Sequence, residues 1–136
     1  MKDKDDPTRP EAPPQVNLKI GIVGPCTAGK STLIKRLDGR YNADLRHIAQ
    51  EHSYVQDMWQ RLSRPRWLIF LDVTYPVSMA RKKLDWTPDE YQEQQRRLAH
   101  ARQNADLYLL TDDLTPDQVA EKVAEFLANQ GIYPLD

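Results

Sequence analysis

The pattern of hydrophobic positions alternates between short apolar segments and longer amphipathic ones. Residues 16–23 are rich in β-branched side chains and turn wholly apolar at their end, which predicts a strand that enters the core. The longest apolar run lies within residues 67–73, and apolar side chains at consecutive positions are typical of a parallel strand covered on both faces. Weaker patterns predict further strands over residues 43–49 and 107–110.

Helical spacing or helix-start signals follow each of these strands. Helices are predicted over residues 31–37, 53–62, 76–84, 88–104 and 116–131. Capping boxes at Thr87 and Thr115 mark two of the starts, and the helix over 53–62 is expected to turn Val55 and Leu62 inward with Met58 and Trp59. Strands that alternate with helices predict a three-layer α/β fold, in which a small parallel sheet of about four strands is flanked by helices.

Length and local composition set the domain organisation. A chain of 136 residues is expected to form one domain. Residues 1–15 mix charges and prolines with almost no apolar side chains, so they are expected to form a disordered arm. The folded domain is predicted to span residues 16–136.

The composition excludes several classes of function. The net charge of −1 does not favour nucleic acid or an anionic membrane, although basic residues outnumber acidic ones in the first half. Cys26 is the only cysteine, which excludes an intrachain disulfide and fits a reducing compartment. No apolar run approaches the ~20 residues of a membrane span, and the charged N-terminus is unlike a signal peptide. A cytoplasmic protein is therefore expected.

The most specific signal is the spacing Gly-x-x-x-x-Gly-Lys-Ser from Gly24 to Ser31, which matches the phosphate-binding P-loop. It lies between a predicted strand and a predicted helix, as that motif requires. Glycines let the backbone turn its N–H groups inward, and the helix start adds its positive end. The residues expected to bind a nucleoside triphosphate are Gly24, Pro25, Cys26, Thr27, Ala28, Gly29, Lys30, Ser31 and Thr32.

Roles within this segment follow from side-chain chemistry. Lys30 is expected to meet the β- and γ-phosphates, and the Ser31 hydroxyl is expected to be a ligand of Mg²⁺. The metal also needs a carboxylate near the end of a strand. Asp72 has that place in the chain pattern, with Glu51 and Asp57 as rival candidates.

Basic and polar groups elsewhere add candidates. Arg81 is the foremost arginine to reach a transferring phosphoryl group, ahead of its basic neighbours and of Arg96, Arg97 and Arg102. Glu51 and His52 lie in a polar cluster at a strand end, where open parallel sheets bind substrates. The three histidines show no metal-ligand spacing. Cys26 is interpreted as a small residue that fits the loop, with a redox-sensitive thiol as the alternative.

The order of these parts resembles the small nucleoside and nucleotide kinases of the P-loop superfamily. The resemblance covers roughly residues 16–130. It rests on the loop at 24–32, on Leu71-Asp72-Val73 followed by the helix with Arg81, and on the closing stretch from Arg97 to Pro116. It implies that Arg81 belongs to a lid over the phosphates, and that the loop after the last strand lies near the nucleotide base.

The chain departs from this family in ways that leave its function open. One strand is missing or merged with residues 43–49. This departure weakens the case for Asp72 as the metal ligand and strengthens the case for Glu51. The lid between Leu84 and Thr87 is also very short. Motifs for guanine are absent, so ATP is preferred by elimination. An ATP- and Mg²⁺-dependent kinase of a small molecule, such as a nucleoside or nucleotide, is the first hypothesis. A nucleotide-binding regulatory module is the second, and a nucleic-acid-associated ATPase is the third.

Overall fold

Four parallel strands form one sheet in the protein, whose computed structural model describes residues 18–82 and 87–135. The strands are β1 (Lys19–Val23), β2 (Asp44–His47), β3 (Trp67–Asp72) and β4 (Leu107–Leu110), in the spatial order β2-β1-β3-β4. The predicted α/β fold with a small parallel sheet is confirmed. The predicted arm over 1–15 and the short lid before Thr87 lie outside the described residues.

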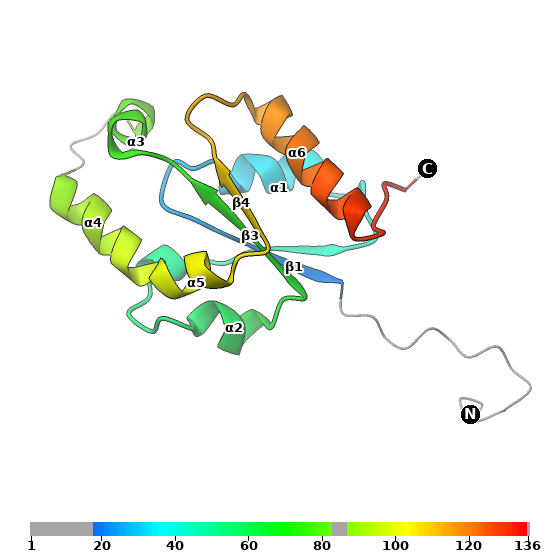
Figure 1. Cartoon of the computed structure of the whole chain (residues 1–136), viewed down its shortest axis with the longest axis horizontal. Helices are drawn as coiled ribbons and strands as arrows, with labels where there is room; N and C mark the ends of the chain where they lie inside the picture. Colours follow the sequence, from blue (N-terminus) through cyan, green and yellow to red (C-terminus); the bar gives the residue numbers. More distant parts are fainter. Residues whose placement is uncertain (1–17, 83–86, 136) are drawn as a thin grey trace, which may run out of the picture.

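Helices cover both faces of this sheet (Figure 1). The helices are α1 (Lys30–Leu37), α2 (Met58–Ser63), α3 (Tyr75–Lys82), α4 (Pro88–Arg97), α5 (Ala99–Asn104) and α6 (Pro116–Asn129), with a short 3₁₀ helix, η1 (Gln50–His52). Helices α1 and α6 pack on one face, and α2 and α5 pack on the other. None of the helices in the described part of the chain is long and apolar enough to cross a membrane.

The alternation of side chains along β3 divides the core into two clusters. Ile69 and Leu71 point toward α1 and α6, whereas Leu68 and Phe70 point toward α2 and α5. All four side chains are buried, as expected of a central parallel strand. Because Asp72 continues the row of Leu68 and Phe70, its carboxylate is directed to the α5 side of the sheet.

The predicted helix over 53–62 is wrong in its first half. Residues 53–57 form turns, and α2 begins only at Met58. The Ser53 hydroxyl accepts a hydrogen bond from the backbone N–H of Val55 (3.1 Å), which competes with a helical turn. Val55, in these turns, and Leu62, near the end of α2, are exposed rather than inward, while Trp59 is buried as expected.

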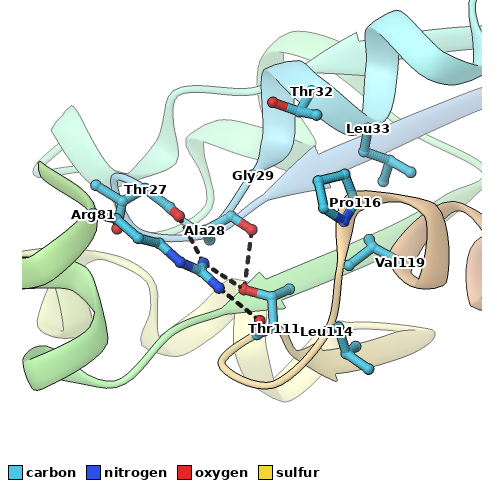
Figure 2. A pocket seen from close by; sticks show the side chains of 10 residues that line it. All are labelled: Thr27, Ala28, Gly29, Thr32, Leu33, Arg81, Thr111, Leu114, Pro116 and Val119. Carbon is cyan, nitrogen blue, oxygen red and sulfur yellow. Dashed lines mark hydrogen bonds between the residues drawn. The ribbon is translucent and has the colours of Figure 1, made fainter.

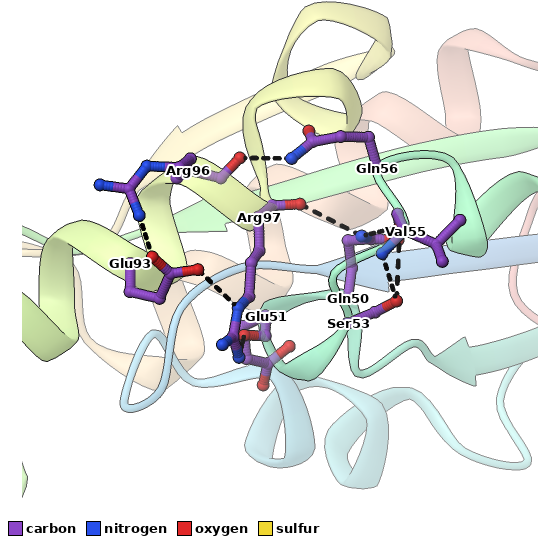
Figure 3. Close-up of polar contacts among 8 residues, drawn as sticks. All are labelled: Gln50, Glu51, Ser53, Val55, Gln56, Glu93, Arg96 and Arg97. Atoms are coloured by element: carbon purple, nitrogen blue, oxygen red, sulfur yellow. Dashed lines mark hydrogen bonds and ion pairs between the residues drawn. The ribbon is translucent and has the colours of Figure 1, made fainter.

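The predicted helix over 88–104 is interrupted at Leu98, which separates α4 from α5. Figure 3 shows the contacts that accompany this break. The amide groups of Gln50 and Gln56 donate hydrogen bonds to the backbone carbonyls of Arg97 (3.1 Å) and Arg96 (2.8 Å), carbonyls that a continuous helix would use itself. The break lets the Leu98 side chain enter the core, where it is fully buried.

Candidate functional site

The loop of residues 24–29, which connects β1 to α1, follows the carboxyl end of a central strand. Gly24 has a φ of +152°, and a Cβ atom there would lie 1.9 Å from the backbone oxygen of Leu71. Only glycine fits this contact between the loop and β3. The close approach fixes the direction in which the loop leaves the sheet.

Gly29 ends the loop and starts α1. It has a φ of +98°, in the left-handed region, and no side chain caps the first turn of the helix. The N–H groups at this helix start are therefore available to a ligand, and the helix dipole favours an anion. The expected loop between a strand and a helix start is present at this point.

Lys30 lies under this loop rather than in solvent. Its Nζ atom donates hydrogen bonds to the backbone oxygens of Gly24 and Pro25 and pairs with Glu51 Oε2 at 2.9 Å. Both side chains of the ion pair are buried, with 5% of each exposed. The other oxygen of the carboxylate, Glu51 Oε1, is buried and has no hydrogen-bond partner among the described residues.

A pocket of about 420 Å³ opens beside this ion pair. Its lining residues come from the loop, from the start of α1 and from three more distant positions, and they are Cys26, Thr27, Ala28, Gly29, Lys30, Ser31, Thr32, His47, Glu51 and Arg81. The structure thus brings the predicted loop residues of 26–32 together with Glu51 and Arg81. Burial, and secondarily the charge of Lys30, lower the pKa of His47, so this imidazole tends to stay neutral.

Arg81, from α3, joins the loop to the segment after β4. Its guanidinium donates hydrogen bonds to the backbone oxygen of Thr27 (3.0 Å) and to both oxygens of Thr111 (3.0 and 2.7 Å), as Figure 2 shows. Among the described residues, these partners are neutral. The Arg81 charge therefore remains available to an anion at the edge of the loop.

A second pocket, of about 240 Å³, shares Arg81 and part of the loop with the first (Figure 2). One end is polar and is formed by Thr27, Arg81 and Thr111. The other end is apolar, and its side chains are those of Leu33, Leu114, Pro116 and Val119. Such a slot suits a flat ligand with a polar rim.

A third pocket, of about 510 Å³, lies toward α4 and shares Cys26 with the pocket beside Lys30. Its lining is strongly charged and includes His52, Lys82, Asp89, Glu90, Glu93, Gln94 and Arg97. Arg97 faces inward, where it contacts the backbone oxygen of Glu51 (3.4 Å) and the ring of Tyr54, whereas Arg96 is exposed. Shared residues therefore connect three pockets along the carboxyl edge of the sheet.

Asp72 and Asp57 do not line any of these three pockets. Asp72 Oδ2 accepts hydrogen bonds from Arg102 (2.9 Å) and from the Tyr108 hydroxyl (2.6 Å) on the α5 side of the sheet. Burial, and next the hydrogen bond to Asp72, raise the pKa of Tyr108 to about 12. Asp57 pairs with Arg61 at the start of α2. Of the three candidate carboxylates, the structure brings only Glu51 to Lys30.

Two contacts at the site escaped sequence reasoning. The side-chain amide of Gln94 makes two hydrogen bonds to Cys26. Its Oε1 accepts from the Cys26 backbone N–H (3.0 Å), and its Nε2 donates to the Cys26 Sγ (3.1 Å). Thr111 accepts from Arg81 and donates toward the backbone of Ala28 and Asp72. Gln94 lies in a run of polar helix residues and gave no signal, whereas Thr111 follows a predicted strand and could have been suspected.

Comparisons with models of protein families, with curated proteins and with solved structures find no match for this chain. What the chain does must therefore be argued from its own residues and their arrangement.

Proposed function

We propose that the chain binds a nucleoside triphosphate, ATP by preference, at a P-loop formed by residues 24–32, and transfers its γ-phosphoryl group to a small molecule. The observation that carries the proposal is the Lys30–Glu51 ion pair, buried beneath a glycine-bounded loop that connects a central parallel strand to a helix start. Lysines are rarely buried in this way unless they are paired, and here the partner is a carboxylate beside the loop. A cation kept beside the N-terminus of a helix suits phosphate binding.

The pockets suggest where each part of the nucleotide binds. The phosphates would meet the loop and Lys30 in the pocket of about 420 Å³, with Arg81 at its edge. The base would lie in the slot between Arg81 and the apolar end formed by Leu114 and Pro116. The charged pocket near α4 would hold the acceptor, because it meets the loop at Cys26.

The residues present fit a role for Mg²⁺. The hydroxyl of Ser31 and the carboxylate of Glu51 line the same pocket, and Glu51 Oε1 lacks any partner within the described part of the chain. These hard oxygen ligands suit Mg²⁺, which with a bound triphosphate would neutralise charge on the phosphate oxygens. Asp72 is not available for this role while Arg102 and Tyr108 hold it.

The transfer itself would need positioning more than covalent chemistry from the protein. The acceptor hydroxyl would attack the γ-phosphorus as its bond to the bridging β–γ oxygen breaks, and the nucleoside diphosphate would leave. Glu51 would orient the hydroxyl, and the proton of the hydroxyl would pass to the transferred phosphoryl group. Lys30 and Arg81 would stabilise the charge on the transferred group.

A nucleotide-binding regulatory module without transfer is the second candidate. It is favoured by hydrogen bonds that the loop groups already make. Gln94 accepts a hydrogen bond from the N–H of Cys26, and the loop carbonyls accept hydrogen bonds from Lys30. These contacts must be exchanged when phosphates bind, and the exchange lowers affinity. Binding of ATP with negligible turnover on any acceptor would identify this candidate.

The test is a thermal-shift series with ATP, GTP and their diphosphates, with and without Mg²⁺. At one hundred times its Kd, ATP stabilises the fold by about 2.7 kcal/mol, which should raise Tm by roughly 10 °C. Lys30→Ala should remove this rise, and the matched control Lys35→Ala, at an exposed lysine of the same helix, should keep it. An ATP-dependent rise that survives Lys30→Ala would contradict the proposed site.

Phosphotransfer needs a separate measurement. A panel of nucleosides, nucleotides and other small hydroxyl compounds is incubated with labelled ATP and Mg²⁺, and phosphorylated products are separated. A product that requires Lys30 and Glu51 supports the kinase. ATP binding without any product, in a panel that saturates the acceptor pocket, supports the regulatory module.

A further inference from the structure

Three side chains with different ligand atoms meet between the β1–α1 loop and η1. The Sγ atom of Cys26, a carboxylate oxygen of Glu51 and an imidazole nitrogen of His52 all lie within 4.8 Å of one another. Thiolate, imidazole and carboxylate together are a typical ligand set for Zn²⁺ and related transition-metal ions. The sulfur ligand disfavours Mg²⁺ and Ca²⁺, which prefer oxygen.

A second observation is that Glu51 has a carboxylate oxygen free to bind a ligand. Glu51 has only 5% of its side chain exposed, yet its Oε1 atom has no hydrogen-bond partner among the described residues. A buried acceptor that loses water without gaining a partner is costly. A metal ion beside the carboxylate would remove that cost.

Neighbouring residues hold two of the three ligands in place. Gln94 Nε2 donates to the sulfur of Cys26 (3.1 Å), and Lys30 Nζ donates to Glu51 Oε2 (2.9 Å). Bonds of this kind orient metal ligands and tune their basicity. Cys26 and Glu51 would contribute two negative charges, which match the charge of a divalent ion, and Lys30 adds one positive charge beside them.

The geometry requires only a small movement to close around an ion. Bond lengths to zinc place tetrahedral ligand atoms about 3.5 Å apart, so the three groups must approach one another by about 1 Å. His52 can move, because 61% of its side chain is exposed. The fourth position would face the charged pocket that Cys26 and His52 line, where water can complete the coordination.

We propose that Cys26, Glu51 and His52 bind one transition-metal ion of the Zn²⁺ class when no nucleotide is present. The metal fastens the β1–α1 loop to η1. The proposal rests on the proposed function in one respect only, which is that both sites use Glu51. While the metal is bound, the Glu51 carboxylate cannot take part in nucleotide binding or phosphoryl transfer. The binding of the metal itself needs neither ATP nor an acceptor.

Cobalt gives a direct test, because Co²⁺ bound to a thiolate shows a charge-transfer absorption. The full chain, reduced and free of nucleotide, is titrated with Co²⁺, and Zn²⁺ is then added. Cys26 is the only cysteine, so the band reports this side chain alone. We expect one Co²⁺ per chain, displacement by Zn²⁺, and no band in Cys26→Ser or Cys26→Ala.

Histidine variants test the rest of the ligand set. His52→Gln should weaken Co²⁺ binding at least tenfold. The matched control His47→Gln removes a nearby imidazole outside the cluster and should change the affinity less than twofold. Circular dichroism confirms that each variant is folded. The proposal is overturned by a folded wild-type chain without the band, by one Co²⁺ per two chains, or by unchanged affinity in His52→Gln.

Lys30→Ala separates this proposal from the proposed function. This variant should lose the response to ATP and keep the cobalt band, because the band arises from the Cys26 thiolate and Lys30 only orients Glu51. A wild-type chain that shows the band and ignores ATP contradicts only the proposed function. A chain that responds to ATP and shows no band contradicts only the metal site.

Discussion

Asp72 and Glu51 lie at the same edge of the sheet and differ in the residues that hold them. Asp72 accepts hydrogen bonds from Arg102 and Tyr108, whereas Glu51 pairs with Lys30 and keeps one oxygen without a partner in the described structure. A carboxylate with satisfied oxygens stabilises the fold, and one with a free buried oxygen is suited to a ligand. The two residues should therefore respond differently to the same substitution.

Asp72→Asn should lower the free energy of unfolding by roughly 1–3 kcal/mol, because Arg102 loses its charged partner, while the ATP-induced rise in Tm remains. Glu51→Gln should instead reduce the Mg²⁺ dependence of ATP binding at least tenfold. Calorimetric titration of each variant with ATP, with and without Mg²⁺, measures the difference. If only Asp72→Asn removes the Mg²⁺ dependence, the first sequence expectation for the metal ligand is restored.

Tyr108 provides a pH-dependent test of the Asp72 cluster. Its pKa is raised to about 12 in the folded state, first by burial and then by the hydrogen bond to Asp72, against about 10 in the unfolded chain. The unfolded state therefore releases its proton first as the pH rises. The stability that this group contributes is complete below pH 10 and is lost as the pH approaches 12.

We expect wild type to lose more stability between pH 9 and pH 11 than Tyr108→Phe, because phenylalanine has no proton to release. Urea unfolding at several pH values measures this difference, and lysine titration cancels because both chains share it. Equal pH slopes for the two proteins would show that neither burial nor the hydrogen bond to Asp72 raises the pKa of Tyr108 in solution.

Among the elements, helix α6 begins at a capping box that could be predicted from the sequence. The Thr115 side chain accepts a hydrogen bond from the N–H of Gln118 (3.1 Å), and the Gln118 Oε1 atom accepts one from the backbone N–H of Thr115 (2.9 Å). The helix buries Val119, Val123 and Leu127 against the core beside α1. Loss of the cap should therefore lower the free energy of unfolding of the whole domain.

Thr115→Ala should lower the free energy of unfolding by about 1 kcal/mol, and Thr115→Ser should retain most of it because serine keeps the hydroxyl. Chemical denaturation of both variants gives the comparison. The role of the cap is refuted if the serine variant loses as much stability as the alanine variant.

The elements that could be predicted from the sequence are those set by local signals. Both capping boxes and the apolar run of β3 act within a few residues, and all three are present as expected. The break at Leu98 was missed because the contacts that accompany it come from groups remote in the chain, namely the amides of Gln50 and Gln56. The hydrogen bond between Gln94 and Cys26 was also missed because the two residues are far apart in the chain.

At the scale of the whole molecule, the candidate site is a consequence of topology. Parallel strands end at one edge, so the loop after β1, η1 after β2 and Thr111 after β4 converge there although they are far apart in the sequence. The helix that Asp72 faces is also set at this scale, because it depends on which helices cover each face of the sheet. The sequence pattern located the strand ends but could not assign the face of the sheet for each side chain.

This convergence predicts where a nucleotide changes the protection of backbone amides. Mg²⁺·ATP should slow hydrogen exchange at least tenfold in the β1–α1 loop, in η1 and around Thr111, because these segments line the three connected pockets. The six-residue helix α2 lies across the sheet from α1 and lines none of them, so its locally exchanging amides should not change. Exchange followed by mass spectrometry, in wild type and Lys30→Ala, measures the pattern. Equal protection of α2 and the loop, or protection that persists in Lys30→Ala, would place the nucleotide elsewhere on the molecule.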